Sequence, residues 1–137
     1  MPKFLLGNAR HQLDDKGRMR IPAKFREGLG GSAYILPGRA GCLFIIPEDK
    51  LLETVKSLSG GNPFADTSDN DLFTEIVGNG DYLEEDGQGR VRLSKELAKA
   101  AGIVKDVVFV GKLTYLEVWP AETWDERYSV LNPDNLS

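Results

Sequence analysis

The stretch "LDDKGRMRIPAKFREGL" at Leu13–Leu29 has the same residue pattern as a later stretch, "EEDGQGRVRLSKELAKAAGI" at Glu84–Ile103. Each copy carries an Asp, two variable residues, Gly-Arg, an apolar residue, a second Arg and another apolar residue. Further along the chain, "CLFIIP" ending at Pro47 aligns with "TYLEVWP" ending at Pro120. The chain is therefore an internal duplication, and its two copies should fold in the same way.

Hydrophobic periodicity predicts one series of elements in each copy: strand, tight turn, strand, short helix, strand, turn, strand and helix. In "RMRI", charged and apolar residues alternate, so Arg18 and Arg20 share one face of a strand while Met19 and Ile21 share the other. The first copy should contain strands over 8–14, 18–21, 33–36 and 42–46, and helices over 22–29 and 48–58, the second with Leu51, Leu52, Val55 and Leu58 on one face.

The second copy follows the same plan after a stretch dense in turn formers at Ser59–Asp71, which predicts a loop, and a short helix at Leu72–Val77. Its predicted elements are strands over 90–93, 107–110 and 115–119, a helix over 94–101 capped by Ser94, a helix from about 121 and a frayed tail at 131–137. We divide the chain into a first repeat at 1–58, a linker with a short helix at 59–78 and a second repeat at 79–137. Neither repeat can bury much apolar surface alone, so the sequence predicts one pseudo-twofold α+β domain.

Composition excludes several classes of protein. The 137 residues are 41% hydrophobic and 28% charged, which is ordinary for a globular protein. No apolar run approaches the roughly 18 residues that a membrane span needs, so we expect no membrane association and place the protein in the cytoplasm. Cys42 and His11 are single examples of their kind, and no His/Cys/carboxylate cluster has ligand spacing. We therefore predict no metal site and no cofactor, with Cys42 as a buried thiol.

The distribution of charge separates the two copies. The net charge of −4 argues against binding nucleic acid through bulk electrostatics. From Leu13 to Arg26, however, five Lys or Arg residues stand against two Asp residues. In the matching stretch Glu84–Glu96, three positive residues stand against four acidic ones. The first copy is locally basic and the second is not.

The Asp-x-x-Gly-Arg unit has a physical logic of its own. The Asp side chain can accept hydrogen bonds from turn backbone, Gly permits a positive φ, and the carboxylate can orient the guanidinium four residues later. An Arg held in this way loses less entropy when it binds phosphate or the edge of guanine. Two interpretations stay open: Asp14–Arg18 and Asp86–Arg90 are turn-stabilising ion pairs only, or they present Arg to an anionic ligand. The additional Arg20, Lys24 and Arg26 favour the ligand.

An enzymatic interpretation finds less support. Asp14 and Asp86, related by the repeat, could resemble the paired carboxylates of acid proteases. An Arg four residues after each Asp would lower the Asp pKa, whereas a shared-proton pair needs one raised pKa. The glycines in "LGG" and "SGG" lack the Gly-Lys-Ser/Thr of a phosphate-binding loop. We predict that the protein is not an enzyme and has no small-molecule substrate.

The two repeated stretches, their spacing and the closing "YLEVWPAETWDERYSVL" at Tyr115–Leu131 closely resemble the MraZ family, whose hallmark is a duplicated Asp-x-x-x-Arg motif. That family is identified as a member of the broader AbrB/SpoVT group of swapped-hairpin DNA-binding folds. The resemblance implies two tandem βαββ-type repeats in one compact domain. It also implies a nucleoid-associated regulator that binds double-stranded DNA at short direct repeats. The expected operator lies upstream of the division and cell wall gene cluster, including the protein's own promoter, and the expected assembly is a ring-shaped homo-oligomer.

The resemblance implies that Arg18 and Arg90 face DNA and that Asp14 and Asp86 hold them. Strand facing and charge add further candidates, so the DNA-binding residues that we predict are Asp14, Lys16, Arg18, Arg20, Lys24, Asp86, Arg90 and Arg92. The second copy departs from the family pattern, with Ser94 where a Pro is common and Ala98 where the first copy has Arg26. An acidic run also adjoins its motif at Glu84–Asp86.

A third interpretation is a protein-interaction ring in which DNA binding is secondary or lost. Four aromatic residues of the C-terminal region could make its subunit contacts, since Trp and Tyr are favoured interface anchors. The same residues could equally belong to the core, because Trp124 and Tyr128 are spaced i, i+4 on one helical face. The four residues are Tyr115, Trp119, Trp124 and Tyr128.

Overall fold

A computed structural model describes residues 4–38, 41–58 and 67–128 of the chain. The predicted frayed tail and most of the predicted loop after residue 58 lie outside these residues. Within them, no helix is long and apolar enough to cross a membrane.

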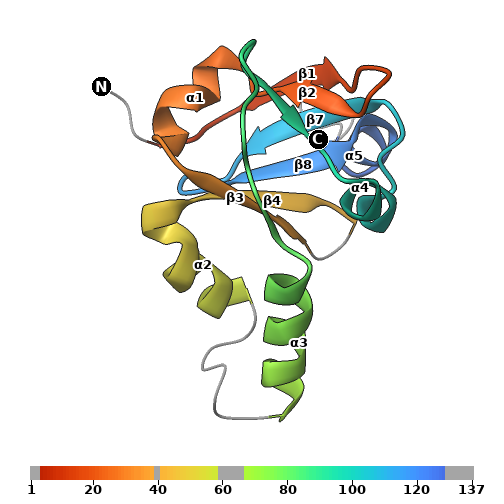
Figure 1. The fold of residues 1–137 in the computed structure, drawn as a ribbon. Helices are drawn as coiled ribbons and strands as arrows, with labels where there is room; N and C mark the ends of the chain where they lie inside the picture. The colour runs from red at the N-terminus through yellow and green to blue at the C-terminus, as the bar shows by residue number, and fades with distance from the viewer. Residues whose placement is uncertain (1–3, 39–40, 59–66, 129–137) are drawn as a thin grey trace, which may run out of the picture.

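A six-stranded antiparallel sheet interleaves the two copies of the repeat (Figure 1). Its order is β1-β7-β8-β4-β3-β5, and β4 and β8, the corresponding strands of the two copies, pair at its centre. At one edge β1 pairs with β7 of the second copy, and at the other β5 pairs with β3 of the first. The bounds are β1 Asn8–Gln12, β3 Ala33–Pro37, β4 Leu43–Pro47, β5 Asp81–Tyr82, β7 Asp106–Gly111 and β8 Leu116–Pro120. Each repeat therefore contributes its first strand to its partner, which confirms the predicted tandem, pseudo-symmetric α+β fold.

A separate two-stranded antiparallel ribbon joins the repeated motifs. It consists of β2, Arg18–Arg20, and β6, Arg90–Arg92. Met19 faces Val91 across this ribbon, and both side chains are buried. The apolar side of the ribbon therefore packs on the core, as the alternation in "RMRI" predicts.

Period-two alternation divides the core between the two faces of the sheet. In β4, Leu43 and Ile45 belong to the layer beneath the ribbon, whereas Phe44 and Ile46 belong to the layer on the opposite face. β7 divides its side chains between the two layers in the same way, and the residues in the middle of this strand are buried on both faces of the sheet. Because both faces are covered, these central strands read as continuous apolar runs.

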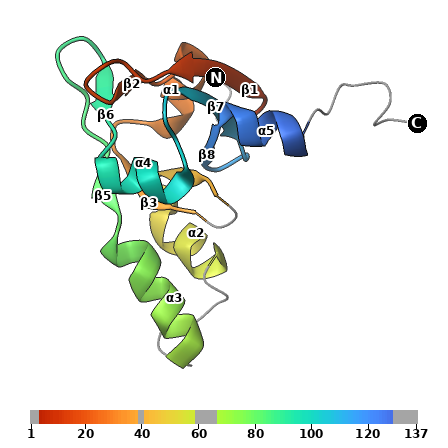
Figure 2. The same ribbon diagram turned by 90° about the vertical axis from the view of Figure 1, so that its right-hand side faces the viewer.

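Five helices cover the sheet within the described residues. They are α1 Ala23–Leu29, α2 Leu51–Leu58, α3 Thr67–Gly78, α4 Lys95–Ala101 and α5 Ala121–Arg127. The Ser94 hydroxyl accepts a hydrogen bond from the Leu97 N–H at 3.2 Å, which confirms the predicted cap of α4. α2 and α3 project below the sheet, next to β3 and β4, and Figure 2 shows them from the side.

Three details of the helices differ from the prediction. Helix α3 begins at Thr67, inside the stretch predicted to be a loop, because Ser, Thr and Asp favour helix N-termini as well as turns. On α2, Val55 is buried, but Leu52 is 63% exposed and faces away from the core. A short 3-10 turn at Glu48–Lys50 precedes α2 and takes the place of the first helical turn that the sequence predicts.

The C-terminal aromatic residues divide between core and surface. Trp119 is buried, and its indole N–H donates to Glu117 Oε1 at 3.0 Å. Trp124 packs over Trp119, and Tyr128 packs on both with a ring centroid 4.8 Å from that of Trp124. Cys42 is also buried, and this burial raises the pKa of its thiol to about 12.

Candidate nucleic-acid interface

The first Asp-x-x-Gly-Arg unit forms a turn closed by a single carboxylate. Asp14 Oδ1 accepts hydrogen bonds from the main-chain N–H groups of Lys16 and Arg18, each at 2.9 Å. Asp14 Oδ2 accepts from Arg18 Nε at 2.8 Å. Gly17 has φ +75°, a conformation that costs other residues free energy. Asp, Gly and Arg therefore each have a defined part in this turn.

The second unit reproduces this geometry. Asp86 Oδ1 accepts from the main-chain N–H groups of Gln88 at 2.8 Å and Arg90 at 3.0 Å. Asp86 Oδ2 accepts from Arg90 Nε at 2.9 Å, and Gly89 has φ +74°. The acidic residues beside this motif leave the turn unchanged.

These hydrogen bonds hold both aspartates in their charged form. The main-chain N–H of Arg18 is the largest cause that lowers the pKa of Asp14 below its usual value, and the Arg18 guanidinium adds to it. The main-chain N–H of Arg90 has the same leading effect on the pKa of Asp86. The direction agrees with the sequence prediction, although the backbone outweighs the guanidinium. Two carboxyl groups that both ionise more readily do not share a proton.

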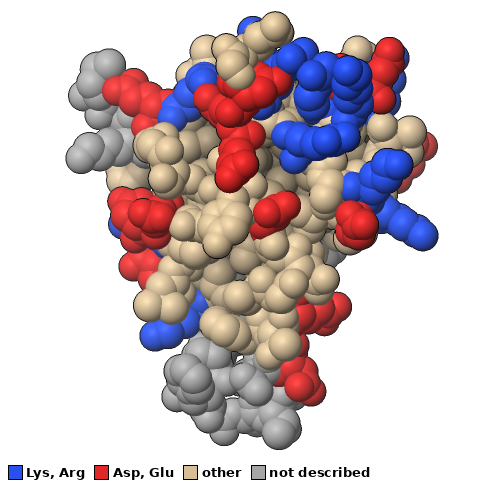
Figure 3. Space-filling model, viewed as in Figure 1, with Lys and Arg blue, Asp and Glu red and all other residues tan. Residues whose placement is uncertain are grey.

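Pairing of β2 with β6 brings the two motifs onto one surface. Arg18 lies opposite Arg92, and Arg20 lies opposite Arg90. Because Met19 and Val91 point into the core, period-two alternation places all four arginines on the outer face of the ribbon. We call these four residues the arginine ribbon. Figure 3 shows Lys and Arg side chains gathered at the upper right, at the end of the molecule where Figure 1 places β2.

The four arginines differ in their surroundings. Arg18 and Arg90 are half-buried against their aspartates, and Arg90 Nη1 also lies 4.0 Å from Asp14 Oδ2. Arg20 and Arg92 are exposed, and within the described residues no acidic group lies at ion-pair distance from either. Like charges directly opposite each other across strands destabilise a sheet. Among the described residues, the charges of Arg20 and Arg92 therefore have no acidic partner, and an anionic ligand would stabilise them.

The predicted lysines lie apart from the paired strands. Lys16 is exposed within the first turn, next to the arginine ribbon. Lys24 lies on α1, and its Nζ is 3.5 Å from the main-chain oxygen of Asn8, at the start of β1.

An additional contact, which the sequence analysis missed, joins the two copies. Arg26 of α1 donates from Nη2 to Glu85 Oε2 at 2.8 Å and from Nη1 to the main-chain oxygen of Gly89 at 3.5 Å. The basic excess of the first copy thus lies against the acidic excess of the second. The opposite charge of the two segments is visible in the sequence and could have suggested a contact. Only the pairing of β2 with β6 shows that the two segments meet.

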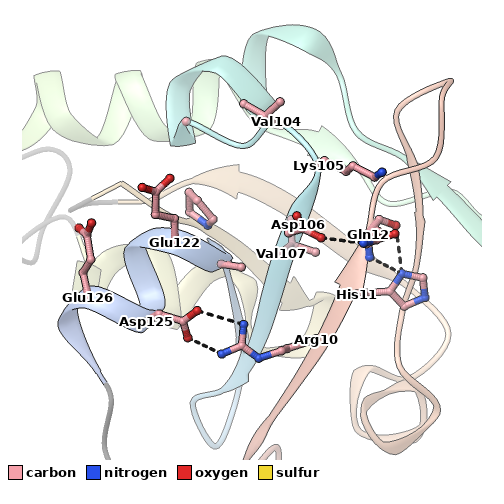
Figure 4. A pocket seen from close by; sticks show the side chains of 13 residues that line it. Arg10, His11, Gln12, Val104, Lys105, Asp106, Val107, Glu122, Asp125 and Glu126 are labelled. Atoms are coloured by element: carbon pink, nitrogen blue, oxygen red, sulfur yellow. Dashed lines mark hydrogen bonds and ion pairs between the residues drawn. The ribbon is translucent and has the colours of Figure 1, made fainter.

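A polar pocket lies between β1, the start of β7 and α5 (Figure 4). Two contacts link polar side chains that line it: the Arg10 guanidinium pairs with Asp125, and Gln12 Nε2 donates to Asp106 Oδ1 at 2.8 Å. Arg10 is the leading cause that lowers the pKa of Asp125. Across the described ranges, no group of three or more His, Cys, Asp or Glu residues is arranged to hold a metal ion. The arginine ribbon, in which Arg20 and Arg92 have no acidic partner among the described residues, is the stronger candidate site.

Comparison with known proteins identifies the family of this chain. The family model described as "MraZ protein, putative antitoxin-like" matches residues 4–71 and 76–137, one match for each repeat. A protein of Thermomicrobium roseum named "Transcriptional regulator MraZ" is 37% identical over 98% of this chain and 94% of its own length. A protein of Saccharopolyspora erythraea with the same name is 35% identical over 88% of this chain and 84% of its own length. The chain belongs to the MraZ family.

Proposed function

We propose that this chain is a sequence-specific DNA-binding transcriptional regulator and that it binds DNA through the arginine ribbon. The observation that carries the proposal is the pair of exposed guanidinium groups, Arg20 and Arg92, that have no acidic partner among the described residues, beside two that are held by aspartates. Guanidinium groups match phosphate oxygens and the O6/N7 edge of guanine, and a two-stranded ribbon fits a major groove. Relatives named as transcriptional regulators support the same function.

The surroundings of the residues suggest distinct roles. Arg20 and Arg92 reach the ligand directly. Arg18 and Arg90 approach it in an orientation that Asp14 and Asp86 fix, so less side-chain entropy is lost on binding. Lys16 and Lys24 then lie at the margin, where a phosphate backbone passes on either side of the groove.

We further propose that the protein binds short direct repeats in the promoter of the division and cell wall gene cluster, including its own, as a ring-shaped homo-oligomer. It would act in the cytoplasm in association with the nucleoid. Family membership supports this part of the proposal. An oligomer would also explain how a chain with a net charge of −4 binds DNA. In an oligomer, several small basic ribbons bind adjacent repeats, and their effective concentration replaces high positive charge.

Fluorescence anisotropy tests the proposal with DNA from upstream of the protein's own gene and a scrambled sequence of equal composition. We expect wild type to prefer the native DNA and the double variant Arg20→Ala/Arg92→Ala to bind it at least tenfold more weakly, since a good contact contributes about 1–3 kcal/mol. Lys50→Ala is the matched control, because it removes a positive charge whose partner is the exposed Glu53 on α2. This control should retain wild-type affinity.

Salt titration of the same variants separates the two kinds of contact. An Arg that binds phosphate should reduce the slope of log affinity against log salt by about one when it is removed, and an Arg that binds a base should instead reduce discrimination between the sequences. Equal, weak binding of both DNAs by wild type and variant would show that the motifs are structural. The protein-interaction ring would then be the function to pursue.

A further inference from the structure

The two Asp-x-x-Gly-Arg turns are anchored to the rest of the fold in different ways, although their internal hydrogen bonds are the same. Leu13, directly before the first turn, is buried, and its main-chain N–H donates to the Lys105 oxygen at 2.8 Å. At the end of that turn, the Gly17 oxygen accepts from the Leu93 N–H at 2.9 Å. Main-chain hydrogen bonds to the second copy therefore hold the first turn on both sides.

The second turn is not held in this way. Glu85, which corresponds to Leu13 in the repeat, is an exposed acidic residue. The counterpart of Leu93 is Ile21, and among the described residues no main-chain hydrogen bond joins the Ile21 N–H to the Gly89 oxygen. At the two positions where the first turn is anchored, the second turn therefore lacks the same support.

Arg26 of α1 contacts the second turn at both of these positions. Its Nη2 donates to Glu85 Oε2 at 2.8 Å, before the turn, and its Nη1 donates to the Gly89 oxygen at 3.5 Å, at the end of the turn. A Cβ added at Gly89 would lie 3.5 Å from Nη1, so the guanidinium rests against the turn itself. The guanidinium carries several N–H donors in a fixed plane, which allows one side chain to bridge two acceptors. A single side chain of the first copy thus spans the turn that precedes Arg90.

We infer that Arg26 is a positioning residue that fixes the second turn and so holds Arg90 in place for DNA. This inference rests on the proposed DNA-binding function and gives Arg26 no DNA contact of its own, since its guanidinium already binds Glu85 and Gly89. The second copy has Ala98 at the corresponding position. The first turn needs no such guanidinium, because main-chain hydrogen bonds already hold it.

Removal of the acidic partner separates positioning from a direct phosphate contact. If Arg26 bound phosphate, Glu85→Ala would release its guanidinium and remove a negative charge, so DNA binding should strengthen. If Arg26 positions the turn, the same change removes one of its two anchors, and DNA binding should weaken. Glu84→Ala is the matched control, because Glu84 is exposed, carries the same charge and has no ion-pair partner among the described residues.

A double-mutant cycle on affinity for the upstream DNA, measured by fluorescence anisotropy, locates the effect. Arg26→Ala should weaken binding about threefold or more in the wild-type background but add little to Arg90→Ala, whose guanidinium it positions. Combined with Arg18→Ala, on the first turn, the two losses should multiply. A merely structural role would not distinguish the two arginines.

The acidic variants complete this experiment. Glu85→Ala should weaken binding, and Glu84→Ala should bind no more weakly than wild type. Losses that multiply in Arg26→Ala/Arg90→Ala, or tighter binding by Glu85→Ala than by Glu84→Ala, would overturn the inference.

Hydrogen–deuterium exchange followed by mass spectrometry, without DNA, tests the positioning alone. The Arg90 N–H binds Asp86 Oδ1 in the second turn, and the Arg18 N–H binds Asp14 Oδ1 in the first. In Arg26→Ala, peptides that cover the second turn should exchange faster, whereas those that cover the first should keep the wild-type rate. Unchanged exchange at the second turn, or equal acceleration at both turns, would contradict a positioning role.

These measurements can fail independently of the DNA-binding proposal. Faster exchange confined to the second turn, together with no preference of wild type for native DNA, would uphold the positioning of the turn and reject the DNA function. Specific DNA binding that Arg26→Ala leaves unchanged would uphold the DNA function and reject the role of Arg26.

Discussion

The two copies of the repeat build the same turn but surround it differently. In both, one aspartate accepts two main-chain N–H bonds and orients one guanidinium. Only the first copy carries Arg26, whose guanidinium crosses to Glu85 and Gly89 of the second, and Ala98 occupies the corresponding position there. The two copies thus share the turn, and residues of opposite charge outside the turn form a contact between the copies. The duplicated halves are therefore alike as folding units and unlike as surfaces.

The largest effect on the free energy of unfolding is expected in the core, where corresponding residues of the two copies can be compared. Phe25 and the corresponding Leu97 are both buried beneath the ribbon. Phe25→Ala should lower the free energy of unfolding by about 3–5 kcal/mol and Leu97→Ala by about 2–5 kcal/mol, through lost apolar burial and the cavity left behind. Urea denaturation measures both. Two separate unfolding transitions in either variant would contradict a single interleaved core.

The caps of the corresponding helices give a smaller difference. Ser94 caps α4 through its hydroxyl, whereas Pro22 precedes α1 without a side-chain cap. Ser94→Ala should therefore lower the free energy of unfolding by about 1 kcal/mol, and Ser94→Asn should restore most of the loss. The same urea titration measures it, and a failure of Asn to restore stability would show that the Ser94 hydroxyl acts otherwise than as a cap.

The contact between the copies should contribute less. Arg26 and Glu85 are both exposed to a large degree, so their coupling in a double-mutant cycle with Arg26→Ala and Glu85→Gln should be about 0.2–1 kcal/mol. It should weaken in high salt. A coupling near zero at low salt would show that the Arg26 bond to the Gly89 carbonyl, and not the ion pair, joins the copies.

The smallest effect concerns the stability that the protein loses in acid, and it allows Asp14 and Asp86 to be compared. Their folded-state pKa values are lowered, so their contribution to stability is complete above the unfolded Asp pKa of about 3.9. It is lost as the pH falls through the lower folded-state values. Asp14→Asn and Asp86→Asn should each remove a similar share of this acid loss, as measured by denaturation between neutral pH and pH 3. A much larger share for one aspartate would show that the turns are unequal.

The sequence by itself determined the features that depend on neighbours along the chain. Repetition of Asp14 to Arg20 at Asp86 to Arg92 showed the duplication, and the chemistry of Asp, Gly and Arg defined both turns. Alternation in "RMRI" placed the arginines on one side of their strand. Each of these features is local, because a turn or a strand face depends on residues a few positions apart.

Only the tertiary structure decided which distant segments meet. The pairing of β2 with β6 makes one four-arginine surface from two motifs, and the same pairing places Arg26 against Glu85. Apolar patterns likewise did not show that Leu52 would face solvent, since a helical stripe names a face but not what covers it. Strand partners are chosen by burial across the whole chain. A short motif therefore specifies the arginine, whereas the fold decides how many arginines act together.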